Sequence, residues 1–127
     1  MKTTNFVPPR VIEKYDRHCT HFNAGQVDEL LADFFTFDAF WSGAGLPERR
    51  GHEQLREMFC EVVTAQTVSH SQGPSAFSET RGWDCRNWHV TPMNSNAQPW
   101  TFRALFFWTW AGEEWLCEAV MCYPLEA

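Results

Sequence analysis

Two histidines and one glutamate are the side chains in this sequence best suited to proton transfer near neutral pH. The first, His18, lies on the apolar stripe of an expected helix, three residues after Tyr15 and four before Phe22. An imidazole in that place can act as a base or an acid, or hydrogen-bond to a ligand carbonyl. The other interpretation is a core histidine that bonds to a neighbouring group, and the sequence leaves both open.

The second histidine, His89, belongs to an expected strand over residues 83–91. Side chains alternate between the two faces of a strand, so one face carries Trp83, Cys85, Asn87, His89 and Thr91, and the other carries Asp84, Arg86, Trp88 and Val90. We expect the first face to line a pocket, with Asn87 and His89 orienting a ligand beside Trp83. The alternative is that this face meets solvent at a dimer interface.

Glu118 is the only acid within the last expected strand, on a face with Leu116, Val120 and Cys122. Burial there would raise its pKa and suit it to general acid or base catalysis. Arg103, on the preceding strand, could clamp a ligand carboxylate or enolate if it faced the pocket. The alternative is a structural ion pair between Arg103 and Glu118.

Motifs for metals and cofactors are missing from the sequence. His18 and His21 are one helical turn apart, but a metal site needs further ligands, and no nearby carboxylate spacing supplies them. No phosphate-binding loop, dinucleotide fingerprint or nucleophile motif is present. We therefore expect neither a metal ion nor a cofactor.

Composition limits the possible classes of protein. The 127 residues suit a single domain over 1–127, and 44% hydrophobic residues with 11 Phe and 7 Trp exclude disorder. So many Trp residues exceed what a small core needs, so some are expected to line a pocket or an interface. The 16 acidic residues outnumber the 10 basic ones, and the basic residues form no cluster. Both observations argue against a nucleic-acid partner.

Three observations bear on the compartment. The segment over residues 1–9 has no apolar core, so no secretory signal is expected, and no apolar run reaches the length of a membrane helix. The five cysteines are odd in number and contain no Cys-x-x-Cys spacing, which predicts free thiols. A cytoplasmic protein without a membrane partner is the expectation.

Helix and strand signals predict an α+β protein in which the helices precede a meandering sheet. The expected helices cover residues 9–23, 27–35 and 52–64, and the expected strands cover residues 38–42, 66–71, 83–91, 100–110 and 115–123. A turn is expected over residues 43–51. The strand over residues 100–110 is apolar on both faces, so one face should pack on the helices and the other on a second subunit. Periodicity does not decide which, and we predict a homodimer.

The segment from Asn23-Ala24-Gly25 to Asp38-Ala39-Phe40-Trp41 resembles the NAGDxxxLxxLFxxDAxW signature of SnoaL-like and ketosteroid-isomerase-like proteins, which belong to the nuclear-transport-factor-2-like superfamily. The resemblance continues through Arg50-Gly51 to the final hairpin. It implies a cone-shaped fold, with three N-terminal helices packed on a strongly curved sheet that encloses a pocket. It also implies that Asp38 braces the helix-to-strand turn and that homodimers form through the sheet.

Ketosteroid isomerase itself is similar in layout but differs at its catalytic positions. Its helix-one tyrosine falls on His18, its catalytic aspartate falls near Ser42 or Gly43, and its second acid falls near Leu105 or Phe106. All three are replaced, so the resemblance argues against that activity. Similar proteins act as isomerases, dehydratases, polyketide cyclases or epoxide hydrolases on hydrophobic molecules, and others have no chemistry.

These observations together predict a cofactor-independent enzyme that moves protons on a hydrophobic, aromatic or polycyclic small molecule. The expected catalytic residues are His18, His89 and Glu118, and the expected substrate contacts are Tyr15, Phe22, Trp41, Phe59, Trp83, Asn87, Trp100 and Arg103. The alternative is a non-catalytic module of the same fold. Such a module would bind a ligand in the pocket or a protein partner on the sheet.

Overall fold

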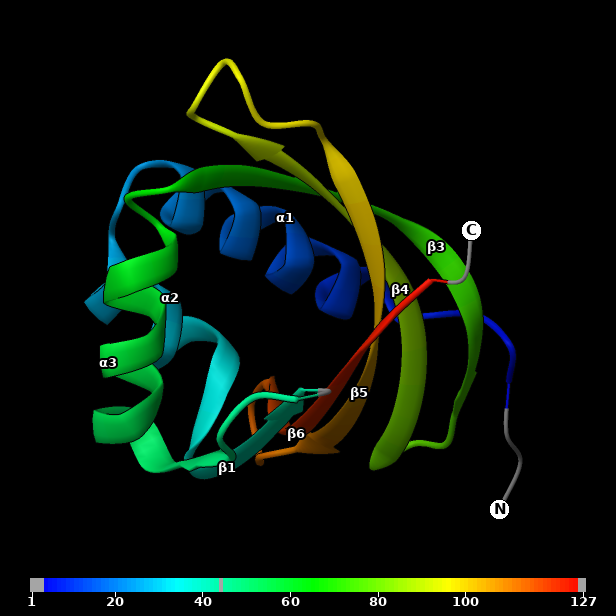
Figure 1. Ribbon diagram of the computed structural model, residues 1–127. Coiled ribbons are helices and arrows are strands. Elements are labelled where there is room, and N and C mark those ends of the chain that lie inside the picture. Colours follow the sequence, from blue (N-terminus) through cyan, green and yellow to red (C-terminus); the bar gives the residue numbers. More distant parts are fainter. Residues whose placement is uncertain (1–3, 44, 126–127) are drawn as a thin grey trace.

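The computed structural model describes residues 4–43 and 45–125 and is an α+β fold with three helices on a six-stranded mixed sheet (Figure 1). The helices are α1 (Pro9–Asn23), α2 (Val27–Phe34) and α3 (Gly51–Val62). The strands are β1 (Phe35–Gly43), β2 (Arg49–Arg50), β3 (Gln66–Phe77), β4 (Arg81–Pro92), β5 (Trp100–Trp110) and β6 (Trp115–Pro124). The expected α+β class is confirmed. The first residues of the N-terminal segment and Ala44 of the expected turn lie outside the described residues.

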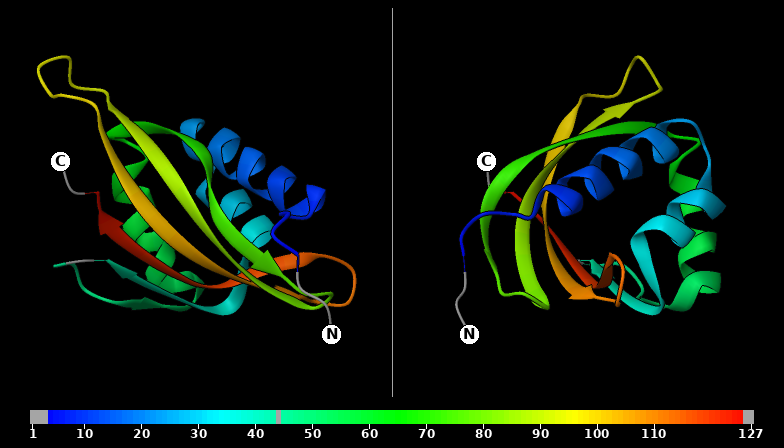
Figure 2. Two further views of the ribbon diagram at one scale, coloured as in Figure 1. Left: turned by 90° about the vertical axis from the view of Figure 1, so that its right-hand side faces the viewer. Right: turned by 180° about the vertical axis from the view of Figure 1, so that it is seen from behind.

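The sheet has the strand order β2-β1-β6-β5-β4-β3. Strands β1 and β6 are parallel, and the other neighbours are antiparallel. All three helices lie on the same side of the sheet, and the other side has no helix over it (Figure 2). The inner face is therefore the face toward the helices, and the outer face is the opposite one.

Helix α1 has the predicted bounds, for reasons visible in the sequence. Pro9 occupies its first turn, where a missing N–H costs nothing. Just past its end Gly25 has φ 71°, which a residue with a Cβ rarely adopts. The buried stripe of α1 carries His18 between Tyr15 and Phe22, as the spacing predicts.

Three strand boundaries differ from the sequence prediction. Strand β1 begins at Phe35, directly after α2 ends at Phe34. The extended backbone at this point lets both Phe34 and Phe35 be buried in the core. Strand β3 continues to Phe77 through a register shift between Gln72 and Ser75, where a Gly-Pro pair makes the sequence look like a turn. The short strand β2 lies inside the expected turn and pairs with β1.

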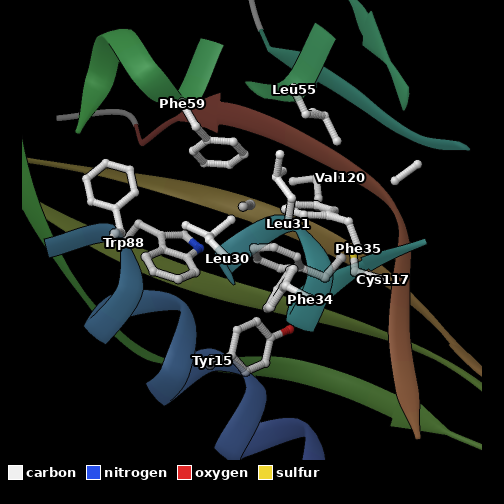
Figure 3. Close-up of a cluster of buried hydrophobic side chains, with 14 of the residues drawn as sticks. Tyr15, Leu30, Leu31, Phe34, Phe35, Leu55, Phe59, Trp88, Cys117 and Val120 are labelled. Atoms are coloured by element: carbon white, nitrogen blue, oxygen red, sulfur yellow. The ribbon is translucent and has the colours of Figure 1, made fainter. Parts of the chain in front are cut away.

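Aromatic side chains from all three helices and the sheet meet in one core (Figure 3). Tyr15 is fully buried, and its hydroxyl accepts a hydrogen bond from the Trp108 Nε1–H at 2.9 Å. The Phe34 ring packs against both, tilted against the Tyr15 ring at 5.8 Å and edge-on to the Trp108 ring at 4.9 Å, measured between centroids. This packing joins α1 and α2 to β5, so it fixes the position of α1 over the sheet.

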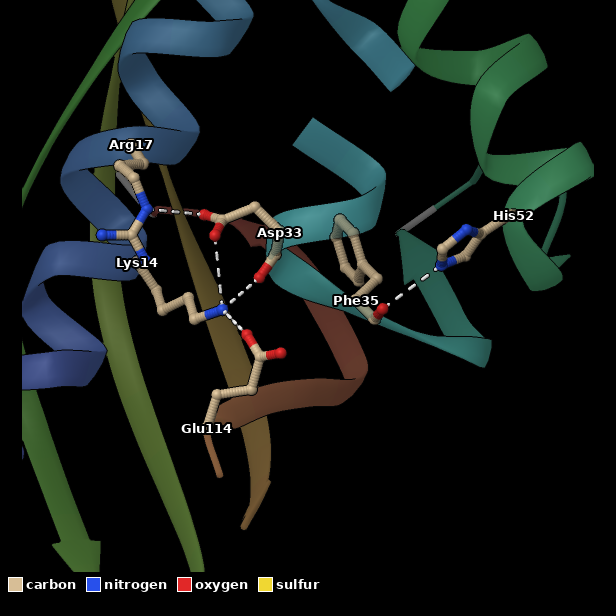
Figure 4. Close-up of polar contacts among 6 residues, drawn as sticks. All are labelled: Lys14, Arg17, Asp33, Phe35, His52 and Glu114. Atoms are coloured by element: carbon tan, nitrogen blue, oxygen red, sulfur yellow. Dashed lines mark hydrogen bonds and ion pairs between the residues drawn. The ribbon is translucent and has the colours of Figure 1, made fainter. Parts of the chain in front are cut away.

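A polar cluster at the edge of the core holds α1 against α2 (Figure 4). The buried Lys14 ammonium bonds to the Asp33 backbone carbonyl, the Asp33 carboxylate and the Glu114 carboxylate. The Arg17 Nε–H donates to Asp33 at 2.9 Å. Burial raises the pKa of Asp33, but the hydrogen bond from Arg17 and the charge of Lys14 outweigh it, so the pKa is lowered. Within the described part of the chain, no helix has the length and apolar character needed to cross a membrane.

Candidate functional site

A cavity of about 480 Å³ lies between α1, α3 and the inner face of the sheet. Its inner end is formed by aromatic rings around one imidazole: His18, Phe22, Phe35, Phe59, Trp88 and Phe106. Its rim carries the exposed side chains of Leu46 and Trp100. None of the described residues that line the cavity is Asp, Glu, Lys or Arg. The site therefore suits an uncharged, largely apolar ligand.

His18 is the one imidazole in this lining, and only 6% of it is exposed. Its ring lies 4.7 Å from that of Phe34, 5.2 Å from that of Trp88 and 5.8 Å from that of Phe59, measured between centroids. The Nδ1 atom is buried with no hydrogen-bond partner among the described residues. Such an unpaired group is costly in a core, so a ligand role explains it better than a structural one.

The environment keeps the His18 ring neutral. Burial, followed by the nearby imidazoles of His70 and His21, lowers the pKa of His18 to about 3, against the opposing effect of Asp33. In the unfolded chain an imidazole takes up its proton near pH 6.5. Between these two values the unfolded state binds a proton that the folded state does not, so this group's contribution to stability is lost as pH falls below about 6.5.

We accordingly expect the His18 ring resonances to stay unchanged when the free protein is titrated from pH 8 to about pH 4.5, because the ring stays neutral over that range. Two-dimensional ¹H–¹⁵N spectra of the imidazole nitrogens, assigned with the variant His18→Gln, provide the measurement. A protonation step of His18 near pH 6 would contradict the buried, neutral ring.

Trp88 lines the cavity, although the expected strand pattern places it on the face opposite the pocket. It is 3% exposed, and its Nε1–H is buried with no hydrogen-bond partner among the described residues. A buried indole N–H without a partner is unusual, because Trp normally places this donor against an acceptor. The structure therefore puts a second unpaired polar group beside His18. The sequence signal that could have placed Trp88 inward is the run of apolar residues on the same face of the neighbouring strand β5, where Phe102 is its partner.

The predicted faces of β4 are reversed. Asp84, Arg86, Trp88 and Val90 are the buried set, whereas Trp83, Asn87 and His89 lie on the outer face. The His89 Nε2 atom is 2.9 Å from Ser71 Oγ, and its Nδ1 is 3.3 Å from Thr101 Oγ1, both across the outer face. The expectation of an inward Asn87 and His89 pair is wrong, because Arg86 and Asp84 form an ion pair at 2.9 Å and are buried together.

Arg103 and Glu118 also lie away from the cavity. The Arg103 Nε–H donates to Asn87 Oδ1 at 3.0 Å, and Glu118 pairs instead with Arg81 at 3.2 Å. A register shift between Phe107 and Trp108 in the β5–β6 pairing moves Glu118 to the outer face. The predicted Arg103–Glu118 pair and the predicted buried glutamate are therefore both wrong.

The remaining predicted residues divide between the cavity and the core. Phe22, Trp41, Phe59 and Trp100 line the cavity, as does His18. Tyr15 does not line it, because its ring is enclosed by Trp88, Phe106 and Trp108. Asp38 is exposed and accepts a hydrogen bond from the Thr36 hydroxyl at 3.4 Å, at the start of β1.

The rim contains one thiol, Cys122. Burial raises its pKa to about 12, against the opposing hydrogen bond from Trp41. A thiol that stays protonated is a poor nucleophile, so covalent catalysis by Cys122 is disfavoured. The Trp41 ring lies against Gly43, where a Cβ would be 2.6 Å from the ring. In the described chain, no three His, Cys, Asp or Glu side chains are grouped as a metal site would require.

The sequence matches no known protein family description and no curated protein. Solved structures do match. They include a ketosteroid isomerase-like protein from Erwinia carotovora atroseptica, with 16% identity, a TM-score of 0.75, and coverage of 93% of this chain and 95% of that one. A nuclear-transport-factor-2-like protein from Novosphingobium aromaticivorans has 11% identity, a TM-score of 0.77, and coverage of 93% and 81%.

A third structure, a candidate scytalone dehydratase from the same organism, has 13% identity, a TM-score of 0.76, and coverage of 92% and 83%. At such low identities these matches describe the fold alone. The chain has a nuclear-transport-factor-2-like fold, as the sequence resemblance implies.

Proposed function

We propose that this protein is a cofactor-independent enzyme that moves a proton on a neutral, hydrophobic small molecule bound in the cavity. The observation that carries the proposal is the unpaired, neutral imidazole of His18 at the inner end of an uncharged cavity. The names of two neighbours, an isomerase-like protein and a candidate dehydratase, are consistent with such chemistry. We place the chain in the SnoaL-like branch, with the cone-shaped pocket of that branch.

The proposed chemistry starts with abstraction of a proton from a carbon next to a carbonyl group. The His18 ring takes that proton, and the electron pair of the C–H bond moves into an enolate. A pKa of about 3 makes the free imidazole a weak base. The enolate charge forming beside it favours the imidazolium, because an opposite charge in a low-dielectric site raises the pKa of His18 during the step. Returning the proton to another carbon gives isomerisation, and protonating a departing hydroxyl gives dehydration.

The second candidate function is a binding module without chemistry. It is supported by the absence of any carboxylate or amine in the described cavity lining, which leaves His18 without a second proton-transfer group. The open volume of about 480 Å³ means that the protein's own side chains leave room for a ligand under either proposal.

Hydrogen exchange separates the two candidates without knowledge of the natural substrate. We expect the protein in D₂O to catalyse deuterium incorporation at the carbon next to the carbonyl of α-tetralone or a related neutral aromatic ketone, measured by NMR against a buffer blank. The variant Ala104→Phe, which places a ring in the cavity from its buried β5 wall, is the control that should lose the effect. Ketones that bind without exchange faster than the blank would favour the binding module.

We also propose that the outer sheet face forms a homodimer, in the reducing cytoplasm that five free thiols would suit. Exposed Trp83, Met121 and Tyr123 flank the half-buried Leu105 and Phe107 on that face. We expect sedimentation equilibrium to give a dimer at micromolar concentration, and the change Met121→Lys to shift it toward monomer. A monomeric wild-type protein at that concentration would contradict the dimer.

A further inference from the structure

A chain of polar contacts lies behind the inner end of the cavity, between α1 and strands β3 and β4. We name Tyr15, Asp16, His70, Asp84 and Arg86 the α1–β4 brace. The Arg86 Nε–H donates to Asp84 Oδ2 at 2.9 Å, and both side chains are almost completely buried. Arg86 Nη1 is 3.1 Å from His70 Nδ1, and His70 Nε2 is 2.9 Å from Asp16 Oδ1. The Arg86 guanidinium also lies 4.2 Å from the centre of the Tyr15 ring.

These contacts define the protonation state of His70. A guanidinium can only donate hydrogen bonds, so the Nδ1 atom facing Arg86 must be an unprotonated acceptor. The proton of the neutral ring then resides on Nε2 and is donated to Asp16. If a second proton were added, Nδ1–H would face the N–H of Arg86, and two cations would stand 3.1 Å apart. The Arg86–His70 contact therefore exists only while His70 is neutral.

The brace supports both polar groups of the cavity. The His70 ring contacts both Tyr15 and Trp88, with centroid distances of 5.5 and 5.6 Å. Trp88 is the next inward residue after Arg86 on β4, and His18 follows Tyr15 by one turn of α1. A change at His70 thus reaches Trp88 by direct contact and reaches His18 through the position of α1.

We propose that His70 is a positioning residue for His18 and Trp88, and that proton uptake by His70 releases Arg86, shifts the two cavity rings and weakens ligand binding. The inference rests on the proposed function only in taking the cavity as the ligand site. The titratable groups around the ring are Tyr15, Asp16, His18 and Cys19 of α1 and Asp84 and Arg86 of β4. Asp16 attracts the added proton and Arg86 repels it, so the protonated ring keeps its Asp16 contact and loses Arg86.

The first measurement uses the free protein. We expect the indole N–H resonance of Trp88, assigned with Trp88→Phe, to move as pH falls from 8 to 4.5. The variant His70→Asn keeps an acceptor oxygen near the Nδ1 position for Arg86 but cannot gain a proton, so its Trp88 resonance should stay constant. His18 does not account for a transition in this range, because its ring stays neutral down to about pH 3. A transition that persists unchanged in His70→Asn overturns the proposal.

Two further variants allow the proposal to be tested if His70→Asn folds poorly. Asp16 lies on the surface, so Asp16→Asn should fold normally while removing the carboxylate that favours protonated His70. We expect the Trp88 transition to move to lower pH in this variant, and an unmoved transition counts against the proposal. The control is His89→Asn, which removes an imidazole from the outer face of β4 and should leave the transition as in the wild type.

The second measurement adds a ligand, the neutral fluorescent probe N-phenyl-1-naphthylamine. We expect its Kd to rise about fivefold or more between pH 7.5 and pH 5 in the wild type, and to stay constant in His70→Asn. A constant Kd in the wild type, or an equal rise in both proteins, overturns the proposed effect on binding. If the probe and related neutral aromatics never bind while the Trp88 transition still depends on His70, the positioning role stands and the proposed function fails.

Discussion

The change His18→Ala is expected to lower the rate of ketone exchange by about 10²-fold or more, the usual loss when a general acid or base is removed. His18 is the one imidazole in the described lining of the cavity, and no Asp, Glu or Lys of that lining could replace it. Probe binding should weaken only modestly, because the proposed proton transfer acts mainly on the transition state.

The same change should leave the fold intact. The His18 Nδ1 atom has no hydrogen-bond partner among the described residues, so its removal breaks no bond there and relieves a buried, unsatisfied group. Thermal melting and the sedimentation profile give this check, with His89→Ala as a matched control on the outer face. An unfolded His18→Ala would show that the ring is a core element, and a folded variant with the wild-type rate would remove His18 from the chemistry.

The sequence predicted the helices well because each carries strong local signals. Pro9 and Gly25 bracket α1, and the apolar spacing around His18 and Phe22 matches one helical face. These signals are local in the chain and need no knowledge of the sheet. The position of His18 in the cavity was predictable for the same reason.

The β4 face was mispredicted because alternation gives two faces without saying which one is buried. Arg86 and Asp84 look like surface residues, yet they pair with each other, and Arg86 also bonds to His70 of β3, 16 residues away. Their burial depends on contacts that no pattern within β4 contains. The error moved Asn87 and His89 into the predicted site and left Trp88 out of it.

Glu118 was mispredicted for a different physical reason. One register shift in the β5–β6 pairing changes which residues face inward, so Cys117 and Val120 are both buried although they are three positions apart. Strict alternation through Glu118 therefore fails at this point of β6. Such a shift depends on the pairing with the neighbouring strand and leaves no clear mark in the sequence.

The buried ion pair provides the largest expected effect on stability. Asp84→Ala should lower the free energy of unfolding by about 3–5 kcal/mol, because it leaves the guanidinium of Arg86 buried without its carboxylate. Urea unfolding at pH 7.5 measures this loss. Glu118→Ala is the matched control, since it breaks the exposed pair with Arg81 and should cost about 1 kcal/mol or less.

The double variant Asp84→Leu with Arg86→Met separates the cost of an unpaired charge from the value of the pair. It removes both charges and fills the same space with apolar atoms, so its stability should recover most of the loss seen in Asp84→Ala. If the double variant is instead as unstable as Asp84→Ala, the ion pair stabilises the fold by more than the cancellation of its two buried charges. A full recovery would mean that the pair is dispensable for folding. The retention of two buried charges behind His18 and Trp88 is then best explained by the hydrogen bond of Arg86 to His70.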